Sequence, residues 1–171
     1  PQKRGVEAVA GESESEVYGK LELAWIPAEA REDRGELEIA QDEAEYIVEL
    51  ADIKSELHAH TTASDGKMSI EELAEAAKER GFHTIAVTDH SRSSAIAGGL
   101  EVDRRMEHIE AVKAADRKAK GIRILCGSEV DILADGSLDY DDDVLAQLDV
   151  VVASPHAALK QEGEVATKRL I

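Results

Sequence analysis

Short apolar runs alternate with segments of helical periodicity from about residue 51 to the last residue of the sequence. The runs are rich in Val, Ile and Leu and predict strands over residues 53–60, 84–88, 122–132 and 149–154. The segments between them predict helices over residues 69–80, 101–120 and 141–147, and a further helix is expected from residue 162.

This alternation predicts an α/β fold with a parallel sheet, because each strand is followed by a helix that can cross back over the sheet. The strand segments are continuous apolar runs rather than alternating ones. Such runs are typical of parallel strands whose two faces are both covered.

Two capping boxes mark helix starts. Ser69 and Glu72 have the S-x-x-E spacing, and the helix that they open is expected to end at Gly81, since glycine favours the position after a helix. Ser13 and Glu16 have the same spacing and predict a short helix that runs to about Lys20.

The first 50 residues differ in character from the rest. They contain the single Trp25, and Pro27 ends whatever element precedes it. Residues 28–50 are acidic and helix-prone without an apolar stripe. We therefore expect a boundary near residue 50, with a linker or accessory segment over residues 1–50 and an α/β domain over residues 51–171.

Composition narrows the class of protein. Apolar residues make up 43% and charged residues 33% of the chain, which argues against wholesale disorder. No stretch of about 18 apolar residues is present, so no membrane association is expected.

The single Cys126 cannot form an internal disulfide, and a reducing, cytoplasmic setting is expected. It lies in an apolar run and is interpreted as a buried small hydrophobe.

The formal net charge is −17, with 20 basic and 37 acidic residues. Such a chain repels a polyanion unless bound cations reverse the local field, so composition alone argues against nucleic-acid binding. Aromatic residues, at 3%, are too few for a base-stacking platform.

Metal-capable side chains recur at the predicted strand ends, where ligands of parallel α/β folds bind. Alternate strand residues face the same way, so His58 and His60 can reach one ion together. Imidazole and carboxylate mixtures suit Zn²⁺, Mn²⁺ or Fe²⁺. The candidate ligands are His58, His60, Asp65, His90, Glu129 and His156.

A single strand-end histidine is usually a structural hydrogen-bonding residue, but four strand ends that all carry such groups favour a metal site. His83 and His108 fall outside this pattern and are interpreted as surface residues. The acidic run Asp135, Asp139, Asp141, Asp142 and Asp143 misses the EF-hand spacing and is interpreted as a solvated turn.

The motifs H-x-H, S-D-G, T-D-H, G-S-E-V-D and S-x-H, in this order, resemble the PHP (polymerase and histidinol phosphatase) domain family. The segments ILADGSLDY and LDVVVAS resemble more narrowly the PHP domain of bacterial family X DNA polymerases. The leader SESEVYGKLELAWIPAEAREDRGELE resembles the end of a polymerase thumb and the linker that follows it.

The resemblance implies that residues 51–171 are about the first four βα units of a distorted, TIM-like (βα)₇ barrel that holds up to three divalent ions, Mn or Zn, with Fe as an alternative. His58, His60 and Glu129 would hold one ion, and Glu129 would bridge to a second that His156 also binds. Asp65 and His90 would hold the third. A further His and an Asp-x-His pair of the family lie beyond the last residue, so a fragment of a larger enzyme is expected.

The resemblance further implies metal-dependent phosphoester hydrolysis, with His58, His60, Glu129 and His156 as catalytic residues. The substrate would be DNA, at gapped or single-stranded 3′ ends, in a 3′-5′ exonuclease or end-processing reaction of DNA repair. Polymerase domains in cis would carry out gap-filling synthesis. The alternatives are a histidinol-phosphatase-like enzyme for small molecules and a catalytically silent structural module of a polymerase.

Overall fold

The computed structural model describes residues 11–38 and 47–171 of the chain. The chain divides into two compact units, Pro1–Asp52 and Ile53–Ile171, and each is described by itself. Within the described part of the chain, no helix has the length and apolarity needed to cross a membrane.

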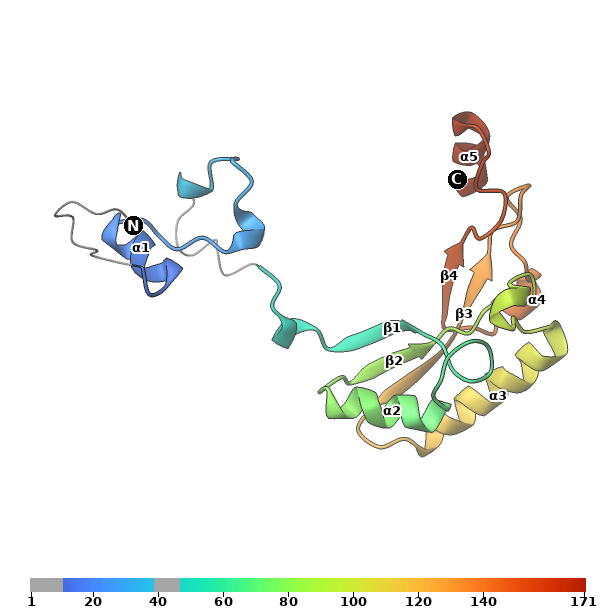
Figure 1. Cartoon of the computed structure of the whole chain (residues 1–171). Helices are drawn as coiled ribbons and strands as arrows, with labels where there is room; N and C mark the ends of the chain where they lie inside the picture. Colours follow the sequence, from blue (N-terminus) through green and yellow to red (C-terminus); the bar gives the residue numbers. More distant parts are fainter. Residues whose placement is uncertain (1–10, 39–46) are drawn as a thin grey trace. The chain divides into compact units, whose positions relative to one another are not determined.

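The first unit contains the short helix α1 (Glu14–Lys20), drawn in blue in Figure 1. As predicted, Ser13 caps this helix: its hydroxyl accepts a hydrogen bond from the Glu16 N–H. Arg31 binds Glu14 through two hydrogen bonds of 3.0 and 2.7 Å and also donates to the carbonyl of Ile26. This pairing ties α1 to the chain that follows Pro27.

The helix-prone segment over residues 28–50 forms no α-helix in its described residues. These described residues contain only the 3₁₀ turns η1 (Ala28–Ala30) and η2 (Glu36–Glu38) and the start of η4 (Leu50–Asp52). Asp33 and Gly35 have φ angles of 56° and 90°, in the left-handed region, and interrupt any helix there. Residues 39–46 lie outside the described part of the chain.

The second unit contains every strand and helix that the apolar pattern predicts, each shortened by at most two residues at either end. Its strands are β1 (Ser55–Ala59), β2 (Thr84–Val87), β3 (Arg123–Asp131) and β4 (Val150–Ser154). Its helices are α2 (Ile70–Glu79), α3 (Val102–Lys118), α4 (Asp142–Leu145) and α5 (Gly163–Leu170), with the 3₁₀ turn η5 (Ala95–Ala97). The Ser69 and Glu72 capping box is complete, and Gly81 follows α2 with a φ of 79°.

The four strands form one parallel sheet in the order β1-β2-β3-β4, which confirms the α/β prediction. The long β3 changes partner along its length. Its first part, up to Cys126, pairs with β2, and its second part, from Gly127, pairs with β4. This stagger gives the sheet the form of a parallel half-barrel, visible in Figure 1 where β3 and β4 turn away from β1 and β2.

The main core lies where α2 and α3 pack against one face of β2 and β3. The stripe that α3 buries includes Ile109 and Val112, and these side chains meet Ile85, Val87 and Ile124 of the strands. Cys126 also lies in this core, 1% exposed, as predicted. Burial raises the pKa of its thiol to about 11, so it remains a neutral apolar group.

The expectation that both sheet faces are covered holds only for the central strands. Ile85, Ala86 and Val87 of β2 are fully buried. Leu57 of β1 and Val151 of β4 are 47% and 37% exposed, because these are the two edge strands of the sheet.

Gly127 marks the position where β3 changes partner, and it leaves no room for a side chain. A Cβ there would lie 2.7 Å from Val150 Cγ1 and 2.9 Å from both Thr88 Cγ2 and the Val150 carbonyl oxygen. The backbone contact cannot relax without moving β4. We expect Gly127→Ala to lower the free energy of unfolding by about 1–3 kcal/mol, measured by urea titration.

Gly163→Ala is the matched control, because nothing lies within 4 Å of a Cβ built on that residue at the start of α5. Equal stabilities of the two variants would contradict a close approach of β3, β2 and β4 at Gly127.

Candidate metal centre

All six candidate ligands converge at the carboxyl ends of the strands, around Glu129. This side chain, on β3, is only 7% exposed. Its Oε2 lies 2.9 Å from His58 Nε2, 3.1 Å from His60 Nε2 and 3.5 Å from His90 Nδ1, and its Oε1 lies 3.2 Å from His156 Nε2. One buried carboxylate of β3 thus faces imidazoles from the ends of the other three strands, two from β1 and one each from β2 and β4.

Asp65 completes the cluster from the loop after β1. Its Oδ1 lies 2.8 Å from His60 Nδ1, and its Oδ2 lies 3.6 Å from His90 Nε2. Each of three groups brings its ligand atoms within 4.8 Å of one another: His58, His60 and Glu129; His60, Asp65 and His90; His90, Glu129 and His156.

The loop that presents Asp65 depends on Gly66. A Cβ on this glycine would lie 2.2 Å from the carbonyl oxygen of His60. The Gly66 N–H also donates to the Thr61 carbonyl, at 2.9 Å. The S-D-G motif therefore follows from a turn that folds back onto the residues just after β1.

The donor set fits divalent ions better than it fits hydrogen bonding within the protein. His58 Nε2 and His60 Nε2 lie 3.2 Å apart and face the same oxygen of Glu129. Among the described residues, none forms a hydrogen bond with His90 Nδ1, although this atom is buried. Buried polar atoms normally have partners, and a cation at this position would supply one. Nitrogen and carboxylate donors in this mixture suit Zn²⁺, Mn²⁺ or Fe²⁺.

The protonation states favour metal binding. Burial acts to raise the pKa of Glu129, but the hydrogen bond from His58 and the charges of nearby histidines outweigh it and hold the pKa below its usual value. The hydrogen bond with His60 lowers the pKa of Asp65. Burial and the neighbouring His60 lower the pKa of His90. Ionised carboxylates and a neutral imidazole are the forms that coordinate metal.

Asp131 orients His156 from the next inward position of β3. Its Oδ1 lies 2.7 Å from His156 Nδ1, while Oδ2 accepts hydrogen bonds of 2.8 and 2.7 Å from the hydroxyls of Ser93 and Ser94. Because Nδ1 is engaged with Asp131, Nε2 is the atom that His156 presents to Glu129. Asp131 is absent from the predicted set, although its i+2 spacing from Glu129 places both on one face of β3.

Asp89 organises the loop that carries His60 and Asp65. Its carboxylate is fully buried and accepts hydrogen bonds from the N–H and hydroxyl groups of both Thr61 and Ser64, at 2.6 to 3.2 Å. His108 Nε2 lies 2.8 Å from the same carboxylate. Burial acts to raise the pKa of Asp89, but these hydrogen bonds lower it well below its usual value.

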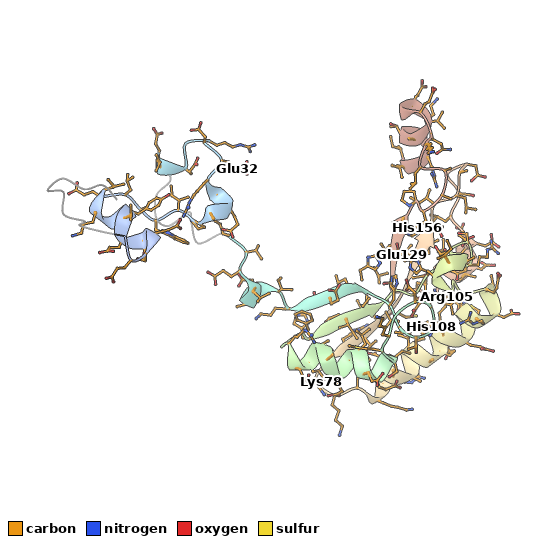
Figure 2. All side chains as sticks on the ribbon, in the orientation of Figure 1. Glu32, Lys78, Arg105, His108, Glu129 and His156 are labelled. Carbon is orange, nitrogen blue, oxygen red and sulfur yellow. The ribbon has the colours of Figure 1, made fainter. Side chains whose placement is uncertain are left out.

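Arg105 of α3 holds the backbone that carries the site. It is fully buried on α3 and donates to the carbonyl oxygens of Asp89, His90 and Gly127, at 2.6, 3.1 and 3.3 Å. Figure 2 shows Glu129 and His156 close together, with Arg105 and His108 of α3 beneath them. One guanidinium therefore joins the segment after β2 and the middle of β3 to the helix.

Two sequence-based interpretations are wrong. His108 is not a surface residue: it is 9% exposed, because its position three residues after Arg105 and four before Val112 turns it inward. The acidic run is not solvated throughout. Asp139 is 3% exposed and accepts hydrogen bonds from Arg92 and from the Ser93 N–H. The interpretation of His83 as a surface residue is confirmed.

Glu129→Gln tests the central carboxylate. We expect this variant to lose more bound Mn²⁺ or Zn²⁺ than any single histidine variant, because the two oxygens of Glu129 together face all four histidines of the cluster. Metal content after gel filtration, measured by plasma mass spectrometry, gives the answer. His83→Gln, at an exposed position outside the cluster, should keep its metal. Equal losses from His83→Gln and His60→Gln would rule out the ligand assignment.

The variant Asp89→Asn tests whether the buried charge of Asp89 stabilises the fold, through the pH dependence of the free energy of unfolding. The folded pKa of Asp89 lies below its unfolded value of about 3.9, so its stabilisation is present above that pH and is lost as pH falls through the folded pKa. At pH 7 we expect Asp89→Asn to lower the free energy of unfolding by about 2–3 kcal/mol, and this difference should shrink by pH 3. Urea unfolding in EDTA measures both values.

Glu107→Gln removes an exposed carboxylate from the same helix as His108 and is the control. It should change stability little at either pH. A deficit of Asp89→Asn that stays constant between pH 7 and pH 3 would contradict a stabilising charge at Asp89.

Comparison with known proteins agrees with this geometry. The model of the PHP domain family matches residues 56–170. The chain is 45% identical to the DNA polymerase/3′-5′ exonuclease PolX of Bacillus subtilis (strain 168), over 92% of the chain and 28% of that protein.

Two proteins named probable phosphatase also match over part of the chain. The one from Syntrophotalea carbinolica is 32% identical over 59% of the chain and 40% of its own length. The one from Shewanella oneidensis is 36% identical over 58% of the chain and 38% of its own length. The chain thus spans less than half of each of these relatives. Because the family model covers most of the chain and all six clustered residues, the chain belongs to the PHP domain family.

Proposed function

We propose that this chain is the metal-dependent phosphoesterase domain of a bacterial family X DNA polymerase, and that it removes nucleotides from DNA 3′ ends. The observation that carries the proposal is the convergence of four histidines and Asp65 around one buried glutamate, Glu129, at the ends of the four strands. Such a cluster has the donors needed to hold several ions side by side.

Each residue has a distinct task in this proposal. Ions held by the cluster would lower the pKa of a bound water and offset charge on the phosphate oxygens. Glu129 would serve as a ligand in two of the three ligand groups. Asp131 would fix the ring of His156, and Asp89 would fix the loop that carries His60 and Asp65. Misplacement of a reacting group by about 1 Å costs roughly a hundredfold in rate, so this support matters.

The net charge of −17 is compatible with a DNA substrate in this arrangement. Bound cations would provide positive charge at the place where the phosphate must lie, so the acidic surface need not contact the substrate. DNA at single-stranded or gapped 3′ ends is therefore the proposed partner, with polymerase domains in cis and a role in DNA repair in the cytoplasm.

Similarity favours the polymerase context. The match to the Bacillus subtilis PolX covers 92% of the chain, more than the residues 53–171 contribute, so it extends into the first unit. That unit is proposed to be the end of a thumb and the linker, as its sequence suggests. A small-molecule phosphatase, acting on a substrate such as histidinol phosphate, is the second candidate, because relatives named probable phosphatase match 58–59% of the chain.

The decisive assay compares substrates on the full gene product that contains this chain, loaded with Mn²⁺. We expect shortening of 5′-labelled single-stranded DNA from its 3′ end, and no release of phosphate from histidinol phosphate. His60→Asn should lower the rate about a hundredfold or more, because His60 belongs to two ligand groups. His83→Gln should be unaffected, and DNA synthesis should survive in both variants.

Hydrolysis of histidinol phosphate alone would assign the chain to the small-molecule phosphatases. Metal binding without hydrolysis of either substrate would favour a structural module.

A further inference from the structure

A pocket of about 420 Å³ opens beside the ligand cluster. At one end it shares Asp65, His90 and His156 with the cluster. Its remaining walls come from the loops that follow β2, β3 and β4, over residues 93–97, 131–134 and 157. A group covalently attached to a phosphate at the cluster would therefore extend into this pocket.

The wall after β2 is held in place by carboxylates. Asp131 accepts hydrogen bonds from the hydroxyls of Ser93 and Ser94, and Asp139 accepts one of 2.7 Å from the Ser93 N–H. Both carboxylates are nearly fully buried. The turn η5, which carries Ile96, is thus anchored at its start, while Ile96 itself is fully exposed at the pocket.

The walls after β3 and β4 are joined by Arg169 of α5. This side chain is 8% exposed and donates hydrogen bonds of 2.8 Å to the carbonyl oxygens of Leu133 and Ala157, and it also contacts the carbonyl of Ile132. One guanidinium therefore spans two loops that are far apart in sequence. The pocket is built by the protein before any ligand enters, as is usual for small-molecule sites.

The lining chemistry separates this pocket from the cluster beside it. Away from the cluster the walls are aliphatic, with side chains from Ala95, Ile96, Ala97, Ile132, Leu133, Ala134 and Ala157. Of the described residues that line it, none is a Lys or Arg. Such walls favour an uncharged, largely apolar group and offer nothing to a second phosphate.

The proposed substrate has one such group. The scissile phosphodiester at a DNA 3′ end joins a single uncharged nucleoside, on one side, to a polyanionic strand on the other. We propose that this pocket binds the 3′-terminal nucleoside, with its base against Ile96 and the loop after β3. This inference rests on the proposed function. The strand then leaves the cluster on the opposite side, away from the aliphatic walls.

Calorimetry on the Mn²⁺-loaded chain tests the pocket without requiring turnover. Thymidine 5′-monophosphate should bind about tenfold or more tightly than inorganic phosphate, because only the nucleotide can fill the pocket. Ile96→Asp should abolish this difference, because its carboxylate replaces the apolar contact, while the Mn²⁺ content stays unchanged. Val165→Asp makes the same change at an exposed position of α5 outside the pocket and should retain the preference.

A second measurement uses DNA and the full gene product. An oligonucleotide that ends in an abasic sugar should show a KM about tenfold higher than one that ends in thymidine, and Ile96→Asp should make the two equal. Hydrolysis with equal KM values in the unmodified protein would overturn the nucleoside pocket and leave the phosphoesterase proposal standing. Preferential binding of the nucleotide without hydrolysis of DNA would instead overturn the proposed function. Equal affinities for nucleotide and phosphate, or Mn²⁺ loss in Ile96→Asp, would also overturn the pocket assignment.

Discussion

The site depends on one buried carboxylate that binds no candidate metal ligand directly. Asp89 is sequestered from water and surrounded by donors from Thr61, Ser64 and His108. A charge in such a place is stable only while every hydrogen bond is made, because water cannot replace a lost donor. This requirement fixes the loop after β1 against the end of β2 and against α3, and so brings His60 and His90 into the same small volume.

The same constraint explains how several acidic groups are tolerated together. Glu129, Asp131 and Asp89 are all buried within one end of the sheet, where like charges repel strongly. Hydroxyls, backbone N–H groups and imidazoles surround Asp89 and Asp131, and imidazoles surround Glu129. The Arg105 guanidinium lies beneath them and donates to backbone carbonyls. Cations held by the ligand groups around Glu129 would add positive charge to this balance.

The sequence was sufficient to predict the elements that periodicity controls and the ligands that strand ends display. Strand alternation placed His58 beside His60, and the βα order placed His90, Glu129 and His156 at the same edge. The sequence was insufficient to predict contacts that form only when the elements pack together. His108 of α3 contacts Asp89 after β2 in this way, and no local sequence pattern predicts that contact. Its helical spacing from Arg105 and Val112 did mark it as inward-facing. The helix propensity of residues 28–50 was misleading in the described residues, because propensity without an apolar face has no packing to stabilise it.

The change of partner along β3 has a consequence for how the native protein opens locally. The ladder with β2 ends at Cys126 and the ladder with β4 begins at Gly127, and the bridge between His90 and Glu129 links the segment after β2 to the later part of β3. A local opening that separates β4 from β3 would therefore break no pair of the β1-β2-β3 ladder. Such an opening would remove His156 and the wall that Arg169 holds, yet leave His58, His60, His90 and Glu129 assembled. Hydrogen exchange of the β4 amides would then measure how often the cluster lacks His156, a state in which bound ions could exchange with solvent.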